Sequence, residues 1–268
     1  MPGLPEPPFP RYGDGMRHAP GMIGWIDAFT TDPATAKQFY QGLFDWESRD
    51  MQTDGGVEYT QFFLDGNLIA GLSPMPPEIA AEGLQPQWIS YVLTDDADAT
   101  CELTREAGGQ VMMSPMDVSD SGRLANIMDP SGGFIGVWQP YSHKGSDVFG
   151  ITGSMAWSEL QTRDLSAALP FYEQVFAWSW ENGMVPGYRI ARVDDLAIAG
   201  AETMPGYVPE EIPAVWLVYF SVADINATTE RAVELGGRIF MPPNPDDAHR
   251  TAGILDPTGA RFMIVSRR

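Results

Sequence analysis

The chain contains the same pattern twice, and this internal repeat constrains its fold more than any other feature. The segment WIDAFTTDPATAKQFYQGLFDW (25–46) aligns without a gap to WSELQTRDLSAALPFYEQVFAW (157–178). Two later pairs of segments follow in the same order, since 88–109 match 216–237 and 123–137 match 250–265. A repeat that fills each half of a 268-residue chain predicts two similar modules rather than one large domain.

Each repeat predicts the same series of secondary-structure elements. Alternating residues at Trp25–Thr30 predict a strand, and Asp32-Pro33 then has the composition of a helix start. Short strands, a Pro-rich loop, another strand, a helix that ends in Gly-Gly and closing strands follow, so each repeat predicts paired βαβββ units. The expected boundaries are an extended N-terminal arm at 1–20, a first module at 21–140 and a second module at 152–268.

The composition excludes several classes of partner. Acidic residues outnumber basic ones by 36 to 16, so no nucleic-acid footprint is visible and an anionic membrane is not expected as a partner. Cys101 is the single cysteine, which rules out an internal disulfide and suits a reducing compartment. No apolar run approaches the ~20 residues of a membrane span, and residues 1–15 have no signal-peptide pattern. We therefore expect a cytoplasmic protein. Its arm would lie on the surface or on a partner subunit, and the second alternative implies a homodimer.

These motifs resemble the vicinal oxygen chelate superfamily, which includes glyoxalase I, the extradiol dioxygenases and the bleomycin resistance proteins. The resemblance is carried by motifs present in both repeats: W-x-D or W-x-E in the first strand, the helix phrase that ends in F-x-W, the Gly-Gly pair and the DPxG turn. It covers residues 21–268 and is strongest for tandem actinobacterial glyoxalase-like proteins. It implies an α+β fold of two tandem glyoxalase-like modules, with mixed sheets curved around a cavity.

The resemblance also implies ligand positions for a divalent metal, and these positions carry none of the usual donors. A metal of this kind takes histidine nitrogen and carboxylate oxygen. The positions fall at Trp25 and Trp157, at Trp88 or Ile89, at Trp216 or Leu217, and at Gly136 and Met263. We therefore expect no bound metal and no other cofactor.

Tryptophans stand at or beside the vacated positions, which in this family point into the concave face of each sheet. A cavity lined by indole rings predicts a flat, apolar small-molecule ligand, although the same rings could simply fill the space. Tyrosines matched between the repeats could donate hydrogen bonds to a ligand carbonyl or could serve as core residues. The predicted substrate-binding residues are Trp25, Trp88, Trp157, Trp216, Tyr59, Tyr91, Tyr188, Tyr219, Met113 and Arg123.

Two carboxylates are candidates for proton transfer. Asp27 and Glu159 each lie two residues after a tryptophan on a strand, so each shares the face of that tryptophan. Burial on an apolar face raises the pKa of a carboxyl group and suits it to acid–base work. The alternative is a structural carboxylate that bonds a tryptophan N–H group or the backbone, or that pairs with Arg123 or Arg250.

His249 is a third candidate, because it breaks the internal symmetry. The pair His249-Arg250 matches Gly122-Arg123 in the first repeat. Histidine transfers protons near neutral pH, although a loop histidine can also be merely solvent-exposed. The predicted catalytic residues are therefore Asp27, Glu159, His249 and Arg250.

The sequence thus predicts a metal-free enzyme that acts by acid–base chemistry on a flat aromatic or polyketide-like molecule. Dehydration, cyclisation, isomerisation or hydration would suit such a site, which makes the expected enzyme a lyase, a cyclase or an isomerase. One alternative is a non-catalytic protein that sequesters an aromatic or cationic antibiotic, as bleomycin resistance proteins do. A metal-dependent glyoxalase or dioxygenase is another alternative, but it requires the ligands that the vacated positions lack.

Overall fold

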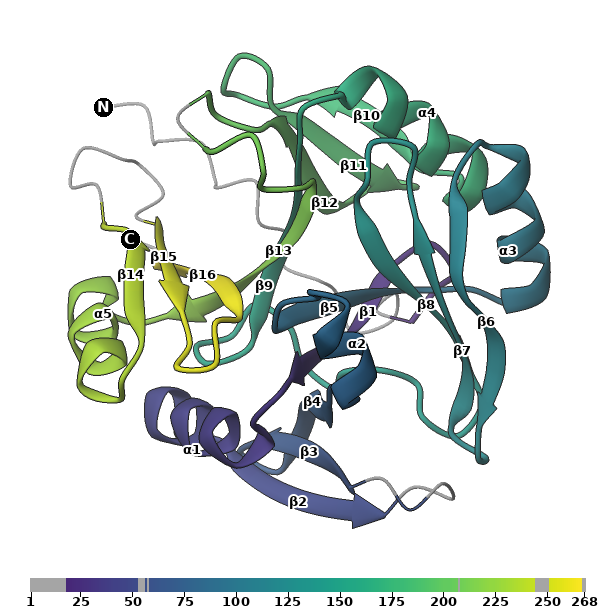
Figure 1. The fold of residues 1–268 in the computed structure, drawn as a ribbon. Coiled ribbons are helices and arrows are strands. Elements are labelled where there is room, and N and C mark those ends of the chain that lie inside the picture. The colour runs from purple at the N-terminus through teal and green to yellow at the C-terminus, as the bar shows by residue number, and fades with distance from the viewer. Residues whose placement is uncertain (1–17, 53–55, 57, 207, 244–250, 267–268) are drawn as a thin grey trace.

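The computed structural model describes residues 18–52, 56, 58–206, 208–243 and 251–266. It contains two eight-stranded mixed sheets, one from each repeat, with helices packed against them (Figure 1). The predicted α+β fold with two tandem modules is therefore confirmed. Most of the predicted N-terminal arm, residues 1–17, lies outside the described residues.

The first module contains strands β1 to β8 and helices α1 to α3. The bounds are β1 (Ile23–Thr30), α1 (Pro33–Phe44), β2 (Glu47–Gln52), β3 (Glu58–Leu64), β4 (Asn67–Pro74), α2 (Pro77–Ala81), β5 (Gln87–Leu93), α3 (Ala97–Glu106), β6 (Gln110–Val118), β7 (Gly122–Met128) and β8 (Phe134–Pro140). The short helix α2 lies inside the segment that the sequence predicts as a Pro-rich loop.

The second module repeats this order with strands β9 to β16. The bounds are β9 (Met155–Thr162), α4 (Leu165–Phe176), β10 (Ser179–Asn182), β11 (Arg189–Val193), β12 (Leu196–Thr203), β13 (Val215–Val222), α5 (Ile225–Glu234), β14 (Arg238–Met241), β15 (Thr251–Leu255) and β16 (Arg261–Ser266). Helix α4 runs through Pro170.

Aspartates start the long helices as the sequence predicts. The Asp32 side chain accepts a hydrogen bond from Thr35 N, and Asp164 accepts one from Ala167 N in the second module. Such caps satisfy backbone donors that the first helical turn leaves unpaired. The helix boundaries are therefore encoded locally in both repeats.

In each sheet the first strands of the two βαβββ units meet at the centre. The strand order is β2-β3-β4-β1-β5-β8-β7-β6 in the first sheet and β10-β11-β12-β9-β13-β16-β15-β14 in the second. The central pair β1–β5 is antiparallel, whereas β1–β4 and β5–β8 are parallel. The parallel pairings bring the last strand of each unit beside its first strand, so residues distant in sequence share one face.

One hydrophobic core spans both modules. Alternate residues of the central strands, such as Ile26 and Trp88, belong to this core together with Phe220 from the second sheet. We call the face of each sheet that carries these residues the core face. Helix α1 lies beside α5 and α3 lies beside α4, so helices of the two modules also meet (Figure 1).

Buried hydrogen bonds tie the modules together with the same symmetry as the sequence repeat. The Tyr40 hydroxyl on α1 donates to Asp256 Oδ2 at 2.8 Å in the second module. The Tyr172 hydroxyl on α4 donates to Asp129 Oδ2 at 2.7 Å in the first. Each aspartate belongs to a DPxG turn, so the repeated motifs also form the contact between the modules.

Candidate functional site

A second face of each sheet carries the buried carboxylates. Trp25 and Asp27 lie on this face in the first module, and Trp157 and Glu159 occupy the matching positions in the second. We call it the site face. The two acidic residues are 8% and 5% exposed, so water contributes little to the solvation of their carboxylates.

In the first module, Asp27 is surrounded by hydrogen-bond donors. Trp25 Nε1 donates to Asp27 Oδ1 at 2.9 Å, and the Tyr59 hydroxyl donates to the same oxygen at 2.6 Å. Tyr91 also hydrogen-bonds the carboxylate. Burial nevertheless outweighs these donors and raises the pKa of Asp27 to about 6.

In the second module, Glu159 has a similar environment with one further acid. The Tyr188 hydroxyl donates to Glu159 Oε2 and the Tyr219 hydroxyl to Oε1, each at 2.9 Å. Gln161 Nε2 bridges Glu159 Oε1 at 3.2 Å and Glu202 Oε1 at 2.8 Å. Burial, reinforced by the nearby Glu202, raises the pKa of Glu159 to about 7. A carboxyl group that titrates near neutral pH can both accept and return a proton.

Two glycines make these clusters possible. Gly71 on β4 pairs with Asp27, and Gly200 on β12 pairs with Glu159. A Cβ atom at Gly71 would overlap the Tyr59 hydroxyl and Asp27 Oδ1, and one at Gly200 would overlap the Tyr188 hydroxyl. The absent side chains therefore let each tyrosine reach its carboxylate.

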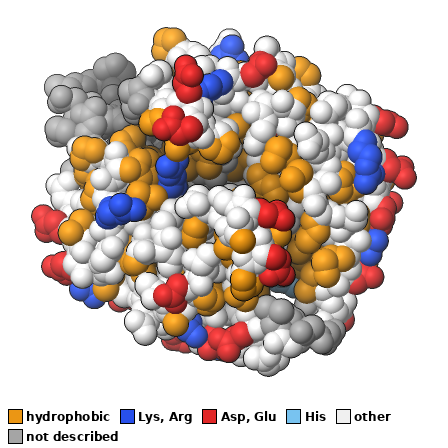
Figure 2. Space-filling view, in the orientation of Figure 1, with side chains coloured by type: hydrophobic (Ala, Val, Ile, Leu, Met, Phe, Trp, Pro, Cys, Tyr) orange, Lys and Arg blue, Asp and Glu red, His pale blue; other side chains and the backbone are white. Residues whose placement is uncertain are grey.

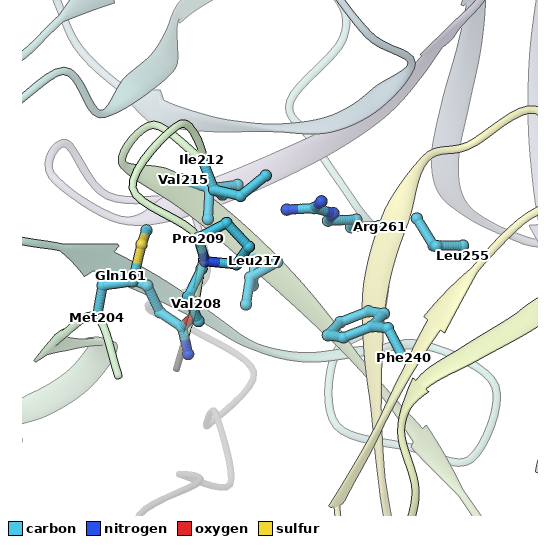
Figure 3. Close-up of a pocket in the computed structure, with 10 residues that line it drawn as sticks. All are labelled: Gln161, Met204, Val208, Pro209, Ile212, Val215, Leu217, Phe240, Leu255 and Arg261. Atoms are coloured by element: carbon cyan, nitrogen blue, oxygen red, sulfur yellow. The ribbon is translucent and has the colours of Figure 1, made fainter. Parts of the chain in front are cut away.

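A pocket of about 280 Å³ lies on the second module and is lined by residues of β9 and β13, the strands that carry Glu159 and its partner Leu217. Gln161 forms part of its wall and also hydrogen-bonds Glu159, so the acid is linked to the pocket through this side chain without lining it. The remaining lining is mostly apolar (Figure 3): Met204, Val208, Pro209, Ile212, Val215, Leu217, Phe240, Leu255 and Arg261. Hydrophobic side chains also gather around a hollow near the middle of the face drawn in Figure 2.

Arg163 fixes one wall of the pocket. Its guanidinium donates to the backbone oxygens of Val208, Pro209 and Ile212 at 3.1, 2.7 and 3.2 Å. It also contacts Met204 Sδ at 2.6 Å. The loop after β12 is thus held in place by charge-assisted hydrogen bonds.

The structure corrects the predicted placement of three substrate-binding residues. Trp88 and Trp216 lie on the core face, where their Nε1 atoms donate to Tyr40 and Tyr172 at 2.8 Å. Their neighbours Ile89 and Leu217 lie on the site face instead. Arg123 does not reach the site face either, because its guanidinium forms ion pairs with Asp98 on α3 and with Asp117.

Of the other predicted residues, six lie around the two buried carboxylates, one lies away from the pocket, and two lie outside the described residues. Trp25, Tyr59 and Tyr91 meet around Asp27, and Trp157, Tyr188 and Tyr219 meet around Glu159. Met113 is half-buried on β6 and pairs with Asn126, away from the pocket. His249 and Arg250 lie outside the described residues, so their predicted catalytic role stays a prediction.

The linker between the modules, residues 141–151, contributes a histidine that the sequence patterns do not single out. The His143 ring lies edge-on to Trp25, with 4.4 Å between the ring centroids, and 5.6 Å from Trp138. Burial lowers the pKa of His143 to about 4, so the ring is neutral near pH 7. The linker is fastened to β1 by the hydrogen bond from Ser146 N to Gly24 O at 2.8 Å. The indole that bonds Asp27 is therefore covered by the linker in the first module.

The site faces do not offer a suitable ligand set for a divalent metal. The positions that the family resemblance implies carry Trp25, Ile89 and Gly136 in the first module, and Trp157, Leu217 and Met263 in the second. Among the described residues, no group of three or more histidine, cysteine, aspartate or glutamate side chains could hold a metal ion. The donor chemistry therefore does not fit the metal, and we derive no step through one.

Sequence reasoning missed the polar residues that distinguish the second module from the first. Gln161, Glu202 and Arg261 stand where the first repeat has Phe29, Ser73 and Phe134. The difference between the two repeats that identifies His249 as a candidate also identifies these three positions.

Among the described residues, no helix is long and apolar enough to cross a membrane.

Comparison with known proteins gives consistent matches for both modules. The model of the glyoxalase/bleomycin resistance protein/dioxygenase superfamily matches residues 22–136 and 154–264. CFP32 of Mycobacterium tuberculosis, whose name assigns it provisionally to the glyoxylases, is 37% identical over 91% of this chain and 94% of its own. The anthracycline biosynthesis protein DnrV of Streptomyces peucetius is 35% identical over 94% of this chain and 95% of its own.

Solved structures confirm the fold at low sequence identity. The Mn(II)-bound glyoxalase from Novosphingobium aromaticivorans superposes with a TM-score of 0.63 at 14% identity, covering 92% of this chain and 82% of that one. A variant of 4-hydroxymandelate synthase from Streptomyces coelicolor gives a TM-score of 0.60 at 13% identity, with 93% of each chain covered.

Proposed function

The chain belongs to the glyoxalase/bleomycin resistance protein/dioxygenase superfamily, and we propose that within this superfamily it is a metal-free enzyme that transfers protons on a flat aromatic or polyketide-like molecule. The reaction class is dehydration, cyclisation, isomerisation or hydration. The observation that carries the proposal is the buried Glu159 carboxyl group, whose pKa is raised to about 7 and which accepts a hydrogen bond from Gln161 in the wall of a mostly apolar pocket.

Glu159 is the proposed acid–base group. Its carboxylate removes a proton from carbon next to a ligand carbonyl, and the carboxyl group so formed returns the proton to carbon or to a leaving hydroxyl. The Tyr188 and Tyr219 hydroxyls stabilise the ionised form, while burial and Glu202 favour the protonated form. The two forms are therefore close in free energy near pH 7, which is the balance that general acid–base catalysis requires.

Gln161 controls access to this acid. Its side chain lines the pocket and bonds both Glu159 and Glu202, so a rotation of Gln161 would expose Glu159 to a bound ligand. The first module has Phe29 at this position, and there the linker His143 covers Trp25. The second module is accordingly the proposed catalytic module.

The relatives support the substrate class. Two anthracycline biosynthesis proteins, DnrV and DauV, match the chain over most of its length, and anthracyclines contain a flat fused-ring system. Their names do not state a reaction. The pocket and the acid of the second module supply the chemistry from which we infer proton transfer.

Proton exchange at carbon provides a test that does not require the natural substrate. The probe is 2-tetralone in D₂O, with deuterium uptake beside the carbonyl followed by NMR. The wild-type protein should accelerate exchange, and Glu159→Gln should reduce the rate by ~10²-fold or more. Asp27→Asn makes the matched change in the first module, and the comparison shows which carboxyl group carries the reaction.

Chelation and product analysis separate this proposal from its alternatives. Exchange should persist in EDTA and should not increase with added Mn²⁺. Dependence on added metal would overturn the metal-free proposal. Because Glu159 does not itself line the pocket, a non-catalytic binding protein is the second candidate. Saturable binding of fused-ring ligands that are all returned unchanged, with no exchange, would favour that candidate.

A further inference from the structure

We propose that the second-module pocket selects a ligand with a carboxylate or another ionised oxygen, which pairs with Arg261. The inference deepens the proposed function and rests on it for the identity of the site. The expected ligand is a small flat anion. One or two fused rings would lie within the pocket, and the charged group would lie at the Arg261 end.

Arg261 is the unengaged cation of this pocket. It lies on β16, half-buried, and its side chain points from the strand toward the loop that carries Pro209 and Ile212 (Figure 3). Among the described residues, no hydrogen bond or ion pair holds its guanidinium. Because the side chain lines the pocket and its guanidinium is not used by the described part of the protein, its N–H groups can donate charge-assisted hydrogen bonds to a ligand anion.

Arg163, which holds the loop that carries Val208, Pro209 and Ile212, differs from Arg261. Its guanidinium is occupied by the three backbone oxygens and the Met204 sulfur described above. Arg163 therefore builds the pocket, whereas Arg261 is left available to a ligand. The planar guanidinium can donate two parallel hydrogen bonds to one carboxylate.

The remaining lining fixes the body of the ligand. Apart from Gln161 and Arg261, the lining residues are apolar, and they include the aromatic ring of Phe240. Phe240 lies over Gly253, where a Cβ atom would overlap its ring, so the backbone makes room for it. A volume of about 280 Å³ lies just below the usual range for ligand pockets, ~300–1,000 Å³, so the ligand body that it encloses is small.

The arginine is present in the second repeat and absent from the matching position of the first. Phe134 occupies the matching position in the first module, so the cation was not needed to maintain the fold. The chain as a whole has a formal net charge of −20, which favours a cationic ligand at long range. Arg261 is nevertheless the one charged side chain among the described residues that line the pocket, since Glu159 and Glu202 bond Gln161 without lining it. A group in direct contact with the ligand outweighs distant charges screened by salt.

The test compares two probes of nearly equal shape at about pH 6. They are 2-naphthoate, which is anionic, and 2-naphthamide, which is neutral, and binding is measured by isothermal titration calorimetry. The wild-type protein should bind the anion at least ~10-fold more tightly, as expected for one charge-assisted pair. Equal affinity for the two probes, or no binding of either, would overturn the inference without any variant.

Variants then assign the preference to one residue. Arg261→Gln should bring the two affinities within ~2-fold of one another, and Arg261→Lys should retain part of the preference. Lys144→Gln removes one exposed positive charge from the linker and should leave the preference unchanged. A preference for naphthoate that survives Arg261→Gln would show that the anion binds elsewhere.

The two proposals can fail separately. A protein that prefers naphthoate but exchanges no proton of 2-tetralone would refute the enzymatic proposal and leave this inference standing. A protein that exchanges protons of the neutral ketone but shows no preference for the anion would do the opposite.

Discussion

Replacement of Asp27 by asparagine should change how stability depends on pH. Asp27 Oδ1 accepts hydrogen bonds from Trp25 and Tyr59, and an asparagine oxygen can occupy the same place. The amide nitrogen would then face the site of Oδ2 and could donate to Tyr91. The substitution therefore keeps the shape of the buried cluster and removes only its ability to ionise.

The magnitude follows from the pKa of Asp27, which burial raises from 3.8 to about 6. Below pH 3.8 the carboxyl group is protonated in the folded and unfolded chains, so it contributes no pH dependence. As pH rises further, the unfolded chain loses the proton first, and folding becomes less favourable. Above about pH 6 the full difference is reached, which corresponds to about 3 kcal/mol for ~2 pKa units.

The assay is denaturant unfolding of the wild type and of Asp27→Asn from about pH 4 to about pH 8. The free energy of unfolding of the wild type should fall by ~2–3 kcal/mol relative to the variant over this range. Other titrating groups, including Glu159, are common to the two proteins and cancel in the difference. The m-values should agree, because the substitution does not change the surface exposed on unfolding.

A difference between the two proteins that stays constant with pH would refute the raised pKa. A difference of opposite sign would show that the donors Trp25, Tyr59 and Tyr91 stabilise the ionised form by more than burial destabilises it. Asp27 would then be a structural anion, and the same doubt would extend to the matching carboxyl group, Glu159.

Three further changes test the architecture of the clusters, the module contact and the pocket. Gly200→Ala should displace the Tyr188 ring from Glu159 and destabilise the protein by ~2–4 kcal/mol; a crystal structure of the variant with the Tyr188 contact intact would contradict this. Tyr40→Phe should leave the buried Asp256 oxygen and the Trp88 N–H group without their partner. The free energy of unfolding, measured by denaturant titration, should fall by ~2–3 kcal/mol. A loss below ~0.5 kcal/mol would argue against a buried hydrogen-bond network. Arg163→Gln should release the pocket wall, seen as faster hydrogen exchange at 208–212 with little change in the strands; unchanged exchange there would mean that the wall is held by other contacts.

The sequence determines the module plan because its signals are local and occur twice. Asp32 and Asp164 cap their helices as their positions predict, and both repeats form the expected βαβββ units. A helix start depends on a few adjacent residues, so propensity and capping suffice to place it. The short strand β2 and the helix α2 carry weaker local signals, and their residues alone do not predict them.

The faces of the central strands are decided only by tertiary structure. From Trp88 to Leu93 every residue of β5 is buried, because the core face packs against the other module and Ile89, Tyr91 and Leu93 on the site face pack against Trp25 and Trp138. Alternation between polar and apolar residues therefore vanishes, and with it the signal that would assign Trp88 to a face. Trp216 is misplaced for the same reason.

The candidate site combines residues whose association the sequence does not reveal. Asp27 and Glu159 could be predicted as buried acids, because each follows a tryptophan at strand spacing. The parallel pairing of β12 with β9 brings Glu202 beside Gln161, and the fold then brings Arg261 from β16 to the same pocket. Side-chain contacts between strands so far apart in sequence depend on sheet order and register, which arise only when both units of a module fold together.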